Sequence, residues 1–216
     1  MHIMHPGDGT GAPAGSLQST AIDDMMIVWP GIGTQIDGLG HAGINHQYYN
    51  GVHARDFVRS SGLLKYGTHT IPPIVTRGLL LDMAAFLGQD ILPAGTAFGR
   101  KEIDGAAKRQ GLRIDKGDVV IFHTGWMKNY EKGAKAWLWQ GWPGLNDEGA
   151  KYLADLGVVA VGADNAGLEV WDGKGGAPGA AVHQTLLSKN GVYIIEGVWT
   201  LDLAADNVDE FLFVLG

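Results

Sequence analysis

Helices and strands alternate along the second half of the chain, and this alternation limits the possible folds more than any other feature. Residues 146–157 predict a helix, because Asn146 can cap its start and Gly157 can close its end. The next three elements are predicted as strand, helix and strand, over 158–164, 179–191 and 192–198. Such alternation is typical of a parallel or mixed sheet with helices on its faces. The sequence therefore predicts an α/β fold.

The first half of the chain predicts fewer elements, and they are shorter. They are a buried strand in 25–31, an extended start, strand and short helix in 71–88, a helix in 104–112, and a strand in 117–126. Residues 1–24 are rich in loop-forming residues, and no domain boundary is visible. We therefore expect one domain over 1–216 with a loop-rich N-terminal segment, 1–24.

Charge and composition exclude several classes of function. The net charge of −7 leaves no basic footprint for nucleic acid, and the absence of cysteine excludes thiolate chemistry and disulfides. The longest apolar run is too short to cross a membrane, and the N-terminus does not resemble a signal peptide. We therefore expect a cytoplasmic protein without nucleic-acid or membrane partners.

The stretch "GIGTQIDGLGH" gathers polar side chains among glycines. Gln35 and Asp37 are two residues apart and share one side of an extended segment, and His41 can join them if the chain turns after Gly38. An amide oxygen, a carboxylate and an imidazole are ordinary ligands for Zn²⁺, Mn²⁺ or Fe²⁺. The alternative is structural: Asp37 caps a turn, and His41 is a hydrogen-bonded core residue.

Two later residues can complete such a site. His183 lies on a predicted helix and Glu196 ends a predicted strand, so both can reach one edge of the sheet. A single histidine and a single glutamate are more often structural. Further candidates are the other histidines and two polar residues after a strand: His46, His53, His69, His123, Asp164 and Asn165.

Six segments, in order, resemble the metal-dependent cyclase family, which includes bacterial kynurenine formamidase and isatin hydrolase. They are "GTQIDGLGH", "YYNG", "IPPIVTRGLLLD", "GDVVIFHTGW", "VGADNAGLEV" and "VHQTLLSKNGVYIIEGV". The resemblance spans roughly residues 25–215 and is nearest to a subgroup with a GTQxD motif. It implies a mixed β-sheet with flanking helices, of the swivelling β/β/α type.

The resemblance also implies roles for particular residues. In the family motif HxGTHxDxxxH, the first two histidines and the aspartate bind metal and the last histidine acts in acid–base catalysis. On this chain the aspartate is Asp37 and the last histidine is His41, while Gly31 and Gln35 replace the metal-binding histidines. The later ligands of the family match His183 and Glu196. Oxygen-rich ligation shifts the preference from zinc toward manganese or magnesium.

These inferences predict a metal-dependent hydrolase that cleaves an amide, cyclic imide or lactone bond of a small molecule. One divalent ion, Mn²⁺ or Zn²⁺, would be held by Gln35, Asp37, His183 and Glu196, with His41 as general base and acid. Aromatic side chains would wall the substrate pocket, with Trp126, Trp29 and Tyr48 as candidates. The alternative is a non-catalytic binding protein that has lost its metal.

The resemblance carries two further expectations. Family members are commonly longer at both ends, so we expect upstream and C-terminal strands of the family fold to lie outside these 216 residues. Assembly into a homodimer or homotetramer is also implied.

Overall fold

A computed structural model of the chain describes six stretches of residues. They are 2–4, 16–19, 23–25, 31, 33–174 and 179–216. The chain divides into two compact units, Met1–Ile32 and Gly33–Gly216. In the first unit, strand β1 (His2–Met4) pairs antiparallel with β2 (Asp23–Met25). Most of the strand predicted at 25–31 lies outside the described residues.

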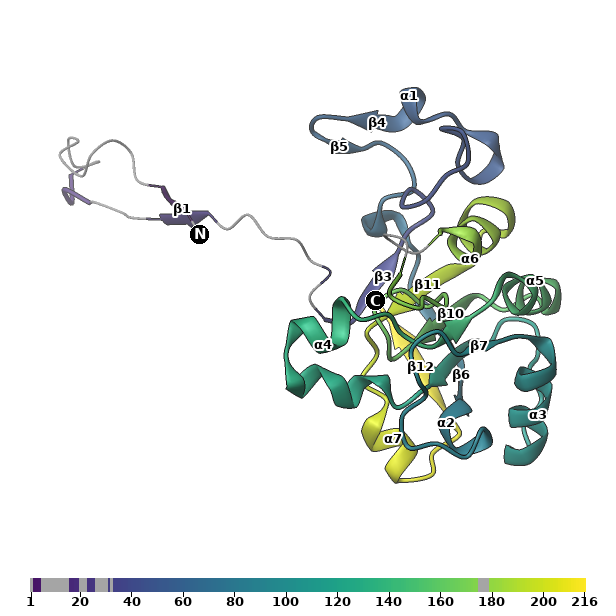
Figure 1. Cartoon of the computed structure of the whole chain (residues 1–216). Coiled ribbons are helices and arrows are strands. Elements are labelled where there is room, and N and C mark those ends of the chain that lie inside the picture. Colours follow the sequence, from purple (N-terminus) through teal and green to yellow (C-terminus); the bar gives the residue numbers. More distant parts are fainter. Residues whose placement is uncertain (1, 5–15, 20–22, 26–30, 32, 175–178) are drawn as a thin grey trace. The chain divides into compact units, whose positions relative to one another are not determined.

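The second unit is built on one mixed sheet of six strands, in the order β12-β6-β8-β10-β11-β3 (Figure 1). The strands are β3 (Gln35–Asp37), β6 (Ile74–Asp82), β8 (Val119–His123), β10 (Ala160–Ala163), β11 (Tyr193–Glu196) and β12 (Glu210–Leu215). The four inner strands run parallel, and the two edge strands, β3 and β12, are antiparallel to their neighbours. The predicted mixed α/β sheet is confirmed.

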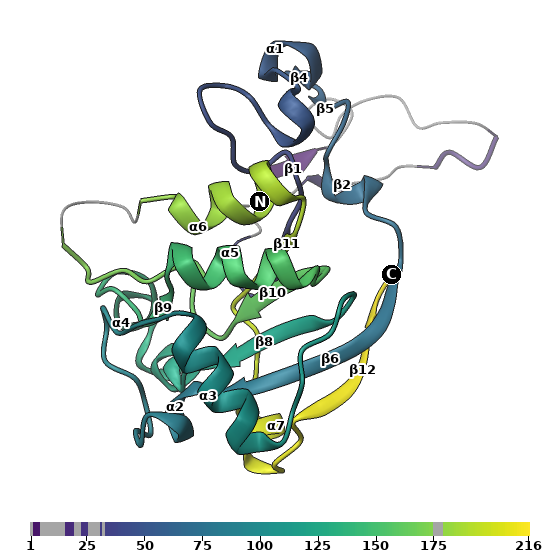
Figure 2. The ribbon, with the colours of Figure 1, turned by 90° about the vertical axis from the view of Figure 1, so that its right-hand side faces the viewer.

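Helices cover the sheet. The α-helices of the second unit are α1 (Ala54–Phe57), α2 (Met83–Phe86), α3 (Arg100–Gln110), α4 (Ala134–Leu138), α5 (Asp147–Leu156), α6 (Ala181–His183) and α7 (Leu201–Ala205). Figure 2 shows α3, α5 and α6 lying over one face of the sheet. A π-helix, η4 (Gln184–Asn190), continues α6 directly. The 3₁₀ helices and short strands are η1 (Tyr49–Gly51), β4 (Val58–Arg59), β5 (Gly62–Leu63), η2 (Thr68–Thr70), β7 (Ala97–Phe98), η3 (Trp126–Lys132) and β9 (Gly144–Leu145).

Each inner strand contributes to two apolar cores, because alternate residues of a strand face opposite sides of the sheet. Val120 and Phe122 of β8 pack on the face covered by α3, α5 and α6. Val119 and Ile121 pack on the other face, with residues of β12 and α7. Burial on both faces explains why the parallel strands are continuous apolar runs in the sequence.

Local signals placed most of the predicted helices and strands correctly. The side chain of Asn146 accepts a hydrogen bond from the Gly149 amide at 2.8 Å, and α5 ends at Gly157, whose φ of 80° is left-handed. The helix predicted at 104–112 begins earlier than expected, at Arg100. In the described part of the chain, no helix is both long and apolar enough to cross a membrane.

Candidate metal centre

Strand pairing brings Gln35, Asp37 and Glu196 to one face of the sheet. In the antiparallel pair of β3 and β11, Gln35 lies opposite Glu196 and Asp37 lies opposite Ile194. Ile194 belongs to the core beneath α5 and α6, so its partner Asp37 points to the same side. Residues two apart share a face, which adds Gln35 and Glu196. Three polar side chains therefore point from the sheet edge toward the helix layer.

His183 reaches this group from α6, where it is 9% exposed. Its Nε2 atom lies 3.3 Å from Oε1 of Glu196 and 3.6 Å from Oδ2 of Asp37. On the opposite side of the ring, Nδ1 lies 3.3 Å from Oε1 of Glu169. The imidazole is therefore surrounded by three carboxylates from three separate parts of the chain.

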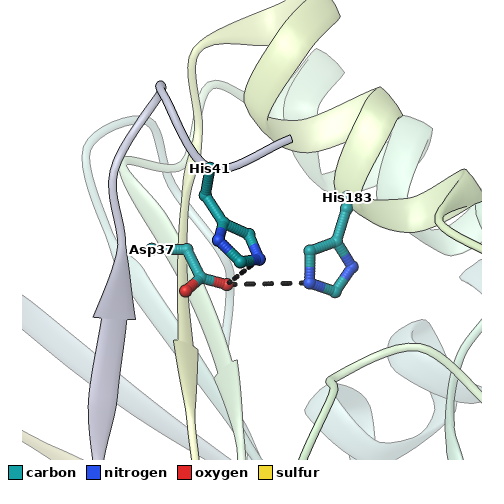
Figure 3. A group of neighbouring side chains, drawn as sticks. All are labelled: Asp37, His41 and His183. Atoms are coloured by element: carbon teal, nitrogen blue, oxygen red, sulfur yellow. Dashed lines mark ion pairs between the residues drawn. The ribbon is translucent and has the colours of Figure 1, made fainter. Parts of the chain in front are cut away.

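His41 joins from the turn that follows β3, as Figure 3 shows. The His41 amide donates to the Gly38 carbonyl at 2.9 Å, and Nε2 of its ring lies 3.8 Å from Oδ2 of Asp37. The turn needs glycine, because a Cβ atom on Gly38 would lie only 2.7 Å from the carbonyl oxygen of Tyr66. The His41 side chain is 55% exposed, whereas that of Asp37 is 7% exposed. His41 is therefore the solvent-facing member of the group.

These side chains fit a divalent metal ion. One ligand atom each from Asp37, His41 and His183 lies within 4.8 Å of the others. Ligands at ~2.1 Å from a tetrahedral ion are about 3.4 Å apart, which is close to the observed separations. Among the described residues, Oδ2 of Asp37 is buried and has no hydrogen-bond partner. A buried carboxylate oxygen without a partner is costly, and a cation would satisfy it.

Gln35 contributes in a different way in this structure. Its amide nitrogen donates to Oε2 of Glu196 at 2.5 Å, which leaves Oε1 of Glu196 facing His183. The side chain therefore orients a carboxylate. Direct binding of a metal ion by the Gln35 oxygen stays a prediction.

Without a metal ion, a proton on His183 can hold the carboxylates together. Burial by itself lowers the pKa of His183, but the neighbouring carboxylates of Asp37, Glu169 and Glu196 outweigh it and raise the pKa to about 11. A metal ion and this proton would compete for the same carboxylates.

Comparisons with known proteins assign the family. The sequence model of the family described as "Putative cyclase" matches residues 5–170, which is more than half of the chain. The chain belongs to the cyclase family. No curated protein matches the sequence significantly.

Solved structures support the cyclase-family fold. A structure described as a novel cyclase has a TM-score of 0.76 and 27% identity, over 90% of this chain and 65% of that chain. A potential metal-dependent hydrolase with cyclase activity has a TM-score of 0.51 and 23% identity, over 93% and 72%. An isatin hydrolase bound to the product analogue thioisatinate has a TM-score of 0.60 and 18% identity, over 84% and 64%. The chain thus spans about two thirds of the length of these proteins.

Sequence reasoning missed one member of this group of side chains, Glu169. It is 4% exposed and contacts the His183 ring from the side opposite to Asp37. It follows β10 by a few residues, in the segment "VGADNAGLEV". An acidic residue just beyond the carboxyl end of a parallel strand was the available signal, because sites in such sheets form there.

Two of the aromatic residues predicted to wall the substrate pocket, Trp126 and Tyr48, pack against other apolar side chains. Trp126 is buried in a cluster with Met127, Trp137 and Trp142, and its indole N–H donates to the Trp137 carbonyl at 3.1 Å. Tyr48 packs edge to face on Phe57, with ring centroids 5.0 Å apart. Trp29 lies outside the described residues. Their roles in substrate binding stay predictions.

Four of the other candidate polar residues, namely His123, Asp164, Asn165 and His53, have structural partners. His123, Thr124, Asp164 and Thr200 form a second buried polar group. Asn165 accepts hydrogen bonds from two backbone amides of the loop that follows it. The His53 ring accepts a hydrogen bond from the amide of Arg55 at the start of α1.

Proposed function

We propose that the chain is a metal-dependent hydrolase that cleaves an amide, cyclic imide or lactone bond of a small molecule. Asp37, His183 and Glu196 would hold one divalent ion, Mn²⁺ or Zn²⁺, with Gln35 as a fourth contact. The observation that carries this proposal is the buried Oδ2 of Asp37, which has no hydrogen-bond partner in the described part of the chain and which both histidine rings face. Membership of the cyclase family supports it.

When bound, a divalent ion supplies a Lewis acid that polarises a carbonyl group and makes water more acidic. The chain's own part is to position groups and to move a proton. His41 is suited to the proton transfer, because an imidazole nitrogen can accept a proton and give it back, and this ring is half exposed beside the site. It would take a proton from water at Nε2 and return it to the leaving group.

The proposal extends to the cellular location and the oligomeric state of the protein. We propose a cytoplasmic homodimer or homotetramer that acts on a small molecule, and the family resemblance supports the assembly.

A metal-free binding protein is the second candidate, and two observations favour it. Gln35 stands where the family motif has an imidazole, and its amide is hydrogen-bonded to Glu196. Protonated His183 can also balance charge among the carboxylates without any ion.

One experiment separates the two candidates. The purified protein is dialysed against Mn²⁺ or Zn²⁺, and its metal content is measured by elemental analysis. Cyclic imides, lactones and N-formyl arylamines are then screened for hydrolysis with and without a chelator. The hydrolase is expected to hold one ion per chain and to lose turnover with the chelator. A protein that binds neither ion would be the metal-free binder.

A further inference from the structure

A tightly built loop carries Glu169 between β10 and α6. The side-chain oxygen of Asn165 accepts hydrogen bonds from the amides of Gly167, at 3.2 Å, and Leu168, at 2.7 Å. Leu168 has a left-handed φ of 55°, which an isolated chain would disfavour. The backbone on both sides of Glu169 is hydrogen-bonded to Leu145. The Leu145 amide donates to the Leu168 carbonyl, and the Val170 amide donates to the Leu145 carbonyl. The backbone of Glu169 is therefore held rigidly.

The Glu169 carboxylate uses both oxygens on α6. Oε2 accepts from the Val182 amide at 2.8 Å, and Oε1 lies 3.3 Å from Nδ1 of His183. The N-cap residue of α6 is Ala180, which has no side-chain acceptor for the free amides of the first turn. Glu169 thus caps the helix from a distant part of the chain and faces the imidazole of the next residue.

We infer that Glu169 is a positioning residue that fixes the orientation of His183 for metal binding. A neutral imidazole has one N–H group and one lone pair, and the acceptor beside one nitrogen decides which nitrogen carries the proton. Glu169 offers only acceptors, so it favours hydrogen on Nδ1. A cation held by Asp37 and Glu196 would replace the proton on Nε2, and Glu169 would then keep the remaining proton on Nδ1, so that the lone pair is on Nε2. This inference rests on the proposed function, because it concerns the ion that Nε2 would bind.

The contact between Glu169 and His183 is long for a hydrogen bond. Nδ1 of His183 has no partner within strict hydrogen-bond geometry among the described residues, although Oε1 of Glu169 lies 3.3 Å away. We therefore take the short bond to Val182 as the stronger anchor of the carboxylate. Its position leaves Oε1 as the acceptor beside Nδ1.

A simple helix-capping role is the competing explanation, and Glu169→Gln separates the two. A glutamine has nearly the same shape, and its oxygen can still accept from the Val182 amide. Its other group is then an NH₂ donor beside Nδ1 of His183, which favours hydrogen on Nε2 instead. The cap survives this change, but the orientation of the imidazole lone pair is reversed.

The test measures affinity for Zn²⁺ and Mn²⁺ by competition with a chelating dye, in wild type and in Glu169→Gln. We expect a loss of about 10–100-fold, as for other residues that orient metal ligands. Asn146→Ala is the matched control, because it removes the side-chain cap of α5. In the described part of the chain, the Asn146 side chain bonds to the Gly149 amide and not to the site. The control is expected to bind metal like wild type. Circular dichroism checks that each variant is folded.

A double-mutant cycle with His183→Ala keeps the test decisive if Glu169→Gln also lowers stability. If Glu169 acts through His183, the glutamine has little further effect on metal affinity once the imidazole is gone. Equal binding by wild type and Glu169→Gln would overturn this inference alone. So would an equal loss in Asn146→Ala, or additive losses in the cycle. A wild-type protein that binds neither ion would overturn the proposed function and this inference together.

Discussion

Two buried histidines of this chain each lie 3.6 Å from an aspartate oxygen, yet their surroundings differ. His123 faces Asp164, and His183 faces Asp37. Around Asp164, Oδ1 accepts from both the amide and the hydroxyl of Thr124, at 3.1 and 2.6 Å. The Thr200 hydroxyl lies 2.7 Å from Nδ1 of His123 and 3.5 Å from Oδ2 of Asp164. Neutral hydroxyl and amide groups therefore satisfy this cluster.

The His183 cluster has more carboxylates than its hydrogen-bond donors can satisfy. Three carboxylates surround one imidazole, and Oδ2 of Asp37 has no hydrogen-bond partner among the described residues. The first cluster is complete as a structural element, and the second is suited to a cation. Burial alone does not distinguish them, because both histidines are largely buried. The difference lies in which groups fill the remaining acceptor positions.

Asp37→Asn should have the largest effect on metal binding. It removes the negative charge from the oxygen that both histidines face. Affinity for Mn²⁺ and Zn²⁺ should therefore fall by more than the ~10–100-fold lost on changing a residue that only orients a metal ligand. The fold should remain, because no described hydrogen bond to that oxygen is lost. Elemental analysis and urea unfolding measure the two effects. Unchanged metal content would show that Asp37 is not a ligand.

His41→Ala should spare the metal but lose turnover. A positioned acid–base group contributes roughly 10²–10⁴-fold to the rate, and the exposed His41 ring is the one placed for proton transfer. Steady-state kinetics on a substrate found by the screen measures the loss, with metal content as the control. A loss of metal equal to that of Asp37→Asn would make His41 a ligand and would remove its assigned role.

Asp164→Ala should lower the stability of the fold but leave metal binding unchanged. It leaves the donors of Thr124 and the Thr200 hydroxyl without their carboxylate partner in a fully buried position. Unfolding free energy should fall by about 2–4 kcal/mol, as measured in urea, while folded protein keeps its metal affinity. Weaker metal binding in the folded variant would contradict the separation of the two clusters.

Gln35→Ala should cause the smallest of the four expected losses, about tenfold in metal affinity. In this structure the Gln35 side chain donates a hydrogen bond that orients Glu196. A chelator-competition assay measures this directly. A loss as large as that of Asp37→Asn would instead support the predicted role of the Gln35 oxygen as a metal ligand.

Much of the fold could be predicted from the sequence, because the signals were local. The cap of Asn146 and the left-handed Gly157 set the bounds of α5, and continuous apolar runs marked the inner strands. Asn50-Gly51 marked a turn, and the structure has Asn50 at a φ of 56° within η1. Such signals depend on backbone geometry within a few residues, so they survive without knowledge of the rest of the chain.

The sequence by itself also determined that Asp37 and His41 are close, because they are only four positions apart. The family pattern added His183 and Glu196 as partners. Only the tertiary structure decided how these groups face one another. The register of β3 on β11 places Gln35 opposite Glu196, across 161 residues of sequence. Glu169 meets His183 only because the loop after β10 packs against the start of α6. Strand register and loop packing depend on contacts between distant segments, and no local pattern encodes them.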